Sequence, residues 1–186
     1  MGDSVMAGLA MMGVDSDGTG IFNFSAITEY RGRSHTMGDD PGAVTVAQFI
    51  KHYNPDVKGG SLGHHIMEYC QDRLCFPFQY RSQQDLLNGA QSGAIAMNLD
   101  HELDYLIPRM KTIKGIDFNN DWKLFTINIG SNDQCKACGL DKDDVTVEKY
   151  GAYVEAAIER IQREIPRTLV NLRKLSLCSF ILIDSG

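Results

Sequence analysis

Apolar residues along the chain alternate between strand-like runs and helical spacing. Residues 122–129 (WKLFTINI) are rich in β-branched and aromatic side chains, which predicts a strand. Residues 147–165 repeat apolar side chains at helical spacing, with Thr146 as a favourable N-cap and Pro166 as a stop. Residues 168–172 (TLVNL) predict the next strand. This strand–helix–strand unit favours an α/β fold with a parallel sheet.

Two earlier segments also show helical spacing. Residues 43–53 place Val46, Phe49, Ile50 and Tyr53 on one face, and the Asn-Pro pair that follows predicts the end of this helix. Residues 99–110 repeat leucine, isoleucine and methionine at the same spacing. A proline at position 108 falls inside this second pattern, so we expect the helix to kink or stop there.

Length and composition narrow the class of protein. The chain has 186 residues, which suits one domain, and 43% hydrophobic with 23% charged residues is an ordinary globular balance. The 18 basic residues against 24 acidic ones leave a net charge of −6, so a general nucleic-acid binder is disfavoured. No apolar run approaches the roughly 20 residues of a membrane span, and the opening Met-Gly-Asp-Ser does not predict a signal peptide.

Three short motifs carry candidate chemistry: residues 2–4 (GDS), 88–93 (NGAQSG) and 130–133 (GSND), the last directly after the predicted strand. An acyl-transfer serine needs an exposed hydroxyl on a tight turn. The oxyanion that forms during acyl transfer needs two or three fixed donors, which a glycine N–H and an asparagine amide can supply. Because parallel strands build sites at their carboxyl ends, we expect Ser4, Gly93 and Asn132 to cluster at one end of the sheet.

With these motifs the chain resembles the SGNH (GDSL-type) hydrolases, and specifically their phospholipase B branch. The resemblance runs from Gly2 to about Leu172 and is strengthened by several further segments. These are Tyr30–Ser34 with Gly38–Asp40, Thr45–Pro55, Asp121–Lys123, and the pair Cys135 and Cys138 that follows the third motif.

The resemblance implies a fold, a reaction and a setting. It implies a three-layer αβα sandwich with a parallel sheet of flavodoxin-like type. It implies Ser4 as the nucleophile, and an oxyanion hole formed by the N–H groups of Ser4 and Gly93 and the side chain of Asn132. The implied substrates are phospholipid or other lipid esters, with contact to a membrane surface and a secreted or membrane-tethered location. No cofactor and no metal are implied, and the oligomeric state is left open.

The chain also departs from this family pattern at both ends. Family members carry an apolar strand before the GDS motif and an Asp-x-x-His block near the C-terminus, and neither has a counterpart here. We therefore expect residues 1–172 to be a partial hydrolase domain and residues 173–186 a divergent tail. A triad without its base keeps roughly 10³–10⁴-fold catalysis over water at best, so we expect weak ester hydrolysis. The rival hypothesis is a non-catalytic fragment or pseudoenzyme.

The missing strand also has a structural consequence. Its neighbours would expose unpaired backbone groups along an apolar slot, so the sequence predicts an aggregation-prone chain. The apolar tail segment 180–183 is an unfavoured candidate to fill this slot.

The 5 cysteines leave alternatives open. Cys135 and Cys138 form a CxxC, which with Cys70 and Cys75 could build a zinc site, or act alone as a thioredoxin-like redox pair. The loose spacing of the second pair and the aspartates that follow the first disfavour both, so a local disulfide or plain thiols are favoured. The family resemblance favours a local disulfide between Cys135 and Cys138.

Three other motifs have a functional and a structural interpretation. Residues 15–23 resemble a calcium-binding EF-hand loop, but Ala26 stands where the bidentate glutamate belongs, so a surface loop is favoured. Ser92 sits one place late for a nucleophile elbow. His64 and His65 could bind a metal, but adjacent strand residues point to opposite faces.

Overall fold

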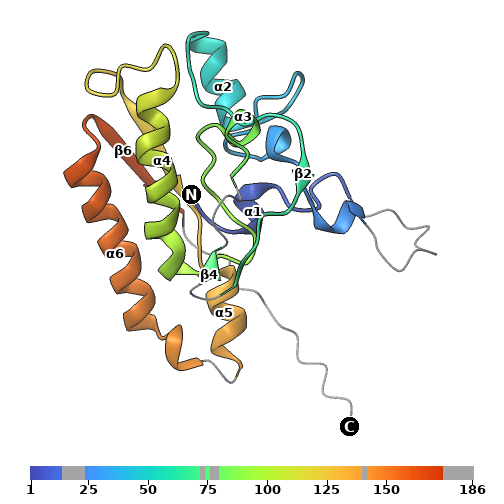
Figure 1. The fold of residues 1–186 in the computed structure, drawn as a ribbon, viewed down its shortest axis with the longest axis vertical. Coiled ribbons are helices and arrows are strands. Elements are labelled where there is room, and N and C mark those ends of the chain that lie inside the picture. The colour runs from blue at the N-terminus through green and yellow to red at the C-terminus, as the bar shows by residue number, and fades with distance from the viewer. Residues whose placement is uncertain (14–23, 72–73, 76–79, 140–141, 174–186) are drawn as a thin grey trace.

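A computed structural model describes residues 1–13, 24–71, 74–75, 80–139 and 142–173. The predicted strand–helix–strand unit is confirmed: strand β5 (Lys123–Ile127) is followed by helix α6 (Val147–Glu164) and then by the parallel strand β6 (Thr168–Leu172). Helix α4 (Leu99–Thr112) lies beside α6, and the two pack over the same face of the sheet (Figure 1). The chain therefore adopts a mixed α/β fold with a small parallel sheet.

The two faces of this sheet differ because side chains alternate along a strand. Phe125 and Ile127 are buried on the face that α4 and α6 cover. Leu124 and Leu169 face each other on the other side and are 42% and 62% exposed. The buried residues of the helices that share the core with Phe125 and Ile127 are Leu99, Leu103, Leu106, Ile107 and Met110 of α4, and Val154, Ala157 and Ile161 of α6.

Helix α4 does not end at Pro108, so the predicted stop is wrong. Proline removes one backbone hydrogen bond, which usually interrupts a helix. Here Pro108 lies on the exposed side, where solvent can satisfy the freed carbonyl, while Ile107 and Met110 continue the buried stripe. The packing of that stripe carries the helix on to Thr112.

Helix α2 (Val46–Tyr53) confirms the other early prediction, with a later start. Thr45 caps it by accepting a hydrogen bond from the Gln48 N–H, and the helix ends at Tyr53, before the Asn-Pro pair. Its apolar side chains do not pack into the core, because Phe49 and Tyr53 are 63% and 87% exposed. Periodicity correctly predicted the helix but not the exposure of its apolar face.

The remaining elements are short. Their bounds are α1 Ser4–Ala7, η1 Phe24–Ile27, β1 Thr28–Glu29, η2 Arg31–Arg33, β2 His65–Ile66, β3 Cys70–Gln71, β4 Leu74–Cys75, α3 Ser82–Asp85, η3 Ala96–Asn98, α5 Ser131–Ala137 and η4 Lys142–Asp144. Strands β1 and β2 pair antiparallel, as do β3 and β4.

The second edge of β5 is paired at its carboxyl end by the first two residues of the chain. The Met1 amino group donates to the Thr126 carbonyl at 2.9 Å, and Gly2 forms a parallel bridge with Asn128. Beside Met1 a groove of about 750 Å³ extends along β5, between the strand, α2 and α4. Its lining is largely apolar and includes Ile50, Leu106, Met110, Leu124 and Phe125.

Candidate active site

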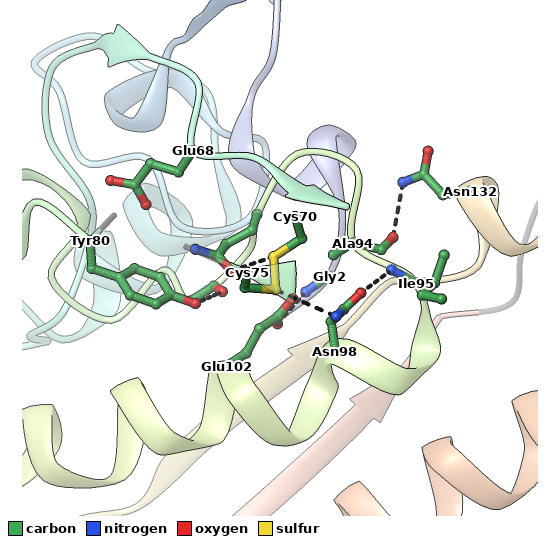
Figure 2. Close-up of a disulfide and its surroundings, with 12 residues drawn as sticks. Gly2, Glu68, Cys70, Cys75, Tyr80, Ala94, Ile95, Asn98, Glu102 and Asn132 are labelled. Atoms are coloured by element: carbon green, nitrogen blue, oxygen red, sulfur yellow. Dashed lines mark hydrogen bonds between the residues drawn. A yellow bond between two sulfur atoms is a disulfide. The ribbon is translucent and has the colours of Figure 1, made fainter. Parts of the chain in front are cut away.

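The three sequence motifs meet at the carboxyl end of β5. Gly2 of the first motif lies against Asn128, and its carbonyl accepts a hydrogen bond of 3.0 Å from the Gln91 N–H of the second motif. Asn132 of the third motif donates from Nδ2 to the Ala94 carbonyl at 2.9 Å, next to Gly93 (Figure 2). One backbone and one side-chain hydrogen bond therefore join segments that are far apart in the sequence.

Ser4 stands on a tight turn. It is the first residue of α1, where backbone N–H groups have no acceptor within the helix. Asp3 caps this turn by accepting a hydrogen bond of 3.0 Å from the Val5 N–H, and Gly8 closes it in a left-handed conformation. Ser4 itself is partly exposed, as an attacking hydroxyl must be.

Burial raises the pKa of the Asp3 carboxyl, and hydrogen bonds with Val5 and Ser131 partly offset the rise. The contact with Ser131 places the residue before Asn132 beside the residue before Ser4. The first and third motifs are thus adjacent beside the candidate residues Ser4 and Asn132.

Gly93 occupies a position that requires glycine. Its φ is +82°, and a Cβ there would lie 2.3 Å from the Cys70 carbonyl oxygen. Asn132 is the second residue of α5, which begins directly after Gly130 at the end of the β5 segment. Both Gly93 and Asn132 are partly exposed.

Two buried carboxylates that were not among the candidate site residues support this end of the sheet. Asp133 accepts the Ala96 N–H with both oxygens, at 3.2 and 3.1 Å, and burial raises its pKa to about 6. Glu102 of α4 accepts the Gly2 N–H at 2.8 Å, and burial raises its pKa to about 8. Asp133 was readable from the third motif, whereas nothing local distinguished Glu102.

Within the described residues, no hydrogen bond joins a histidine to the Ser4 hydroxyl. His35 lies beside Val5, yet its Nε2 faces Arg173 Nη1 at 2.5 Å, and burial followed by the Arg173 charge lowers its pKa. The ring of His64 lies beside that of Tyr30. His52 packs on Tyr53 and His101 stacks on Tyr80, and His65 belongs to a buried cluster described below.

The disulfide in the structure joins Cys70 and Cys75, which corrects the expectation for Cys135 and Cys138 (Figure 2). Cys70 and Cys75 are directly opposite one another in the β3–β4 pair, which brings their side chains close. Cys135 and Cys138 are exposed free thiols at the end of α5. This pairing removes two of the four thiols of the zinc alternative, and a thioredoxin-like CxxC would open a helix, not end it.

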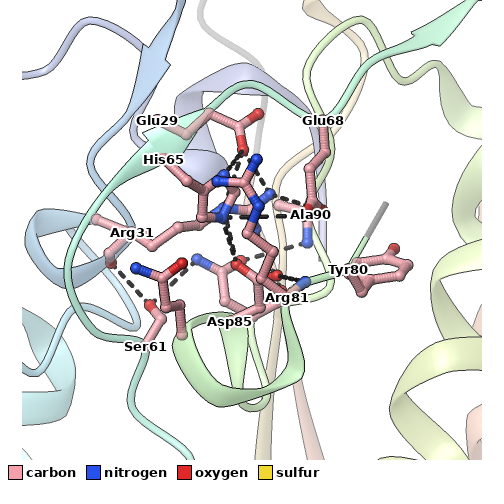
Figure 3. Close-up of polar contacts among 12 residues, drawn as sticks. Glu29, Arg31, Ser61, His65, Glu68, Tyr80, Arg81, Asp85 and Ala90 are labelled. Atoms are coloured by element: carbon pink, nitrogen blue, oxygen red, sulfur yellow. Dashed lines mark hydrogen bonds and ion pairs between the residues drawn. The ribbon is translucent and has the colours of Figure 1, made fainter. Parts of the chain in front are cut away.

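A cluster of buried charged side chains lies behind the second motif (Figure 3). His65, Glu68 and Asp85 bring ligand-type atoms within 4.8 Å of one another, an arrangement that can hold a metal. The guanidinium of Arg31 already lies 3.3 Å from Asp85 and 3.5 Å from Glu68. Because this fixed positive charge opposes a second cation, we assign the cluster as an ion-pair network.

Glu68 is the least satisfied member of that network. Its Oε1 is buried without a hydrogen-bond partner. Burial and the Asp85 charge raise its pKa to about 8, which Arg31 only partly offsets.

The structure excludes one further alternative, and two others fall on residues that it does not describe. Ser92 is buried and donates its hydroxyl to Glu29 at 2.5 Å, which is incompatible with a nucleophile. The calcium-like loop 15–23 and the tail segment 180–183 lie outside the described residues.

Known proteins with similar sequences are ester hydrolases of one family. The family model for GDSL-like lipase/acylhydrolase matches residues 1–185. Membrane-associated phospholipase B1 is 29% identical in Rattus norvegicus and 30% in both Mus musculus and Homo sapiens, over 92% of this chain. The chain spans 11% of the length of each of these relatives. No solved structure matches it significantly.

Proposed function

Because this chain belongs to the family of GDSL-like lipases and acylhydrolases, we propose that it is a serine ester hydrolase with Ser4 as its nucleophile. The N–H groups of Ser4 and Gly93 and the side chain of Asn132 form the oxyanion hole. The observation that carries the proposal is the meeting of three motifs at one end of β5, through the Gly2–Gln91 and Asn132–Ala94 hydrogen bonds. Glycine and asparagine supply the donors that a tetrahedral oxyanion needs.

The substrate class follows from the relatives. All three are named as membrane-associated phospholipases, so we infer phospholipid or related lipid acyl esters as substrates, in a secreted or membrane-bound setting. In the part of the chain that the structure describes, no helix is long and apolar enough to cross a bilayer. On the same family ground the complete fold is a three-layer αβα sandwich, with residues 1–172 forming its hydrolase part.

The expected rate is low for residues 1–186 alone. A neutral serine hydroxyl is a weak nucleophile without an adjacent base. Since no described histidine is hydrogen-bonded to the Ser4 hydroxyl, Ser4 relies on the oxyanion hole and substrate binding, which leaves roughly 10³–10⁴-fold catalysis over water.

The test is labelling and turnover of the purified chain. We expect a fluorophosphonate probe to label Ser4 slowly, and p-nitrophenyl butyrate and phosphatidylcholine vesicles to be hydrolysed weakly. Ser4→Ala should abolish labelling and hydrolysis. The matched control is Ser82→Ala, which also changes the first residue of a four-residue helix but lies outside the three motifs.

Equal labelling of wild type and Ser4→Ala would overturn the assignment of the nucleophile, and so would a wild-type chain that neither reacts nor turns over. Rapid turnover that Ser4→Ala abolishes would keep the nucleophile but show that a base is present. His35 and His64 would then be replaced first.

A further inference from the structure

A fully buried ion pair lies directly behind the second motif. Arg31 and Glu29 are both fully buried, and Arg31 donates from Nε and Nη2 to Glu29 Oε2 at 3.0 and 2.7 Å (Figure 3). Removing two charges from water is costly, and a buried pair of this kind is weak evidence for stability by itself. What the two residues hold is therefore informative.

Each member of the pair forms a hydrogen bond with one end of the second motif. Arg31 donates from Nη1 to the Asn88 carbonyl at 3.2 Å. Glu29 keeps its second oxygen, Oε1, for the Ser92 hydroxyl at 2.5 Å. The two ends of the turn that precedes Gly93 are thus tied to one rigid, fully buried unit.

Ser92 is held at three points. Besides its hydroxyl, its N–H donates to the Glu68 carbonyl at 2.9 Å, and its own carbonyl accepts the Cys70 N–H at 2.8 Å. The hydrogen bond from the Cys70 N–H comes from the β3–β4 pair, which the Cys70–Cys75 disulfide cross-links. No rotation of Ser92 is possible without breaking at least one of these bonds.

The orientation of Ser92 determines that of the Gly93 N–H. A trans peptide group is planar, and its carbonyl and N–H point in opposite directions. The peptide group between Ser92 and Gly93 has its carbonyl directed at Cys70, so its N–H points away from Cys70.

We propose that the Glu29–Arg31 pair is a positioning device for the Gly93 N–H, acting through the Ser92 hydroxyl. In this role Glu29 and Arg31 never touch substrate. They keep an oxyanion donor aimed in advance, so that no reorganisation is needed when the negative charge develops. The catalytic part of this inference rests on the proposed function, whereas the geometric part does not.

The test uses Ser92→Ala, which removes the hydroxyl that links Glu29 to the turn. Ser92→Thr retains a hydroxyl and serves as the rescue variant. The control is Thr45→Ala, which removes another buried hydroxyl, donated to the Gly38 carbonyl at 2.6 Å outside the second motif. Amide hydrogen exchange at Gly93 and the rate of Ser4 phosphonylation are measured in the full chain.

We expect Ser92→Ala to speed Gly93 exchange at least tenfold relative to amides of α6 and to slow Ser4 phosphonylation about 10- to 100-fold, because a small misplacement of a catalytic group has effects of this size. For ester hydrolysis kcat should fall while KM stays within about twofold. Ser92→Thr should recover most of both effects, and Thr45→Ala should show neither.

Unchanged Gly93 exchange in Ser92→Ala would overturn the proposal, as would equal effects in Thr45→Ala. If Ser92→Ala does not fold, Glu29→Gln is tested in the same way, because glutamine retains an acceptor for the hydroxyl but loses the charge that holds Arg31. A wild type that does not react at Ser4 defeats the proposed function, while the exchange measurement still decides whether the pair orients Gly93.

Discussion

Two regions around strand β5 differ in what lines them: hydrogen-bonded polar groups in one and exposed apolar side chains in the other. At the carboxyl end, which we call the site end (Gly2, Ser92 to Ala94 and Asn132), polar groups are joined by specific hydrogen bonds. On the other face and at the start of the strand lies the bare flank (Trp122, Leu124 and Leu169), where the same three side chains are 74%, 42% and 62% exposed.

The difference shows what each region depends on. The site end is supported from within, by α4 through Glu102 and by the Glu29–Arg31 pair behind the second motif. The three side chains of the bare flank line part of the groove beside Met1, where apolar burial would be favourable but is incomplete. Truncating a side chain should therefore be costly at the site end and nearly neutral at the flank, whereas apolar residues added in the groove should stabilise the fold.

The largest effect is expected from Arg31→Met. It leaves Glu29 and Asp85 buried without their cation, which should lower the free energy of unfolding by about 3–5 kcal/mol. Leu169→Ala on the bare flank should change it by about 0.5 kcal/mol or less. Urea denaturation followed by circular dichroism measures both, and equal losses in the two variants would contradict the comparison.

A gain of about 2 kcal/mol is expected when a short apolar, β-branched segment is joined before Met1. Such a segment can pair with the second edge of β5 and bury side chains in the groove, each contributing roughly 1.5–3 kcal/mol against an ordering cost of roughly 1.5 kcal/mol per residue. A serine-glycine segment of equal length is the control. Tm and size-exclusion chromatography report the result, and an unextended chain that is monomeric and no less stable would rule out an unfilled strand position.

A smaller, graded effect is expected from pH. The folded-state pKa values of Glu68 and Glu102 are both raised to about 8, above an unfolded value of 4.5. Folding therefore binds protons between these values, so stability is greatest at the acidic end and falls as pH rises toward 8, by up to about 1.4 kcal/mol per pH unit for each carboxyl.

Glu68→Gln and Glu102→Gln keep the shape of the side chain but remove the titration. Each should flatten the decline of Tm between pH 5 and pH 8.5, and the double variant should flatten it most. Asp117→Asn is the control, because Asp117 is exposed and its pKa is lowered. A slope that neither glutamine variant alters would contradict the burial argument.

The elements with strong local patterns were predictable from sequence. Apolar spacing correctly predicted α6 and α4, and the β-branched run predicted β5, because these patterns are set by neighbouring residues. The motif also singled out Gly93, although only its φ of +82° and the nearby Cys70 carbonyl show why glycine is required there. The same local reasoning failed at Pro108, where distant packing carried the helix onward, and at α2, whose apolar face lacks a buried partner.

Only the tertiary structure decided which partners meet. The sequence shows five cysteines, but the antiparallel register of β3 and β4 selects Cys70 and Cys75. An arginine in a Tyr-Arg-Gly segment is ordinarily a surface residue, yet Arg31 is fully buried because carboxylates from three separate segments surround it. Ser92 and Glu29, 63 positions apart, form their hydrogen bond for the same reason. Periodicity records how a residue relates to its neighbours in the chain, whereas pairing of buried charges depends on desolvation by segments that come together only on folding.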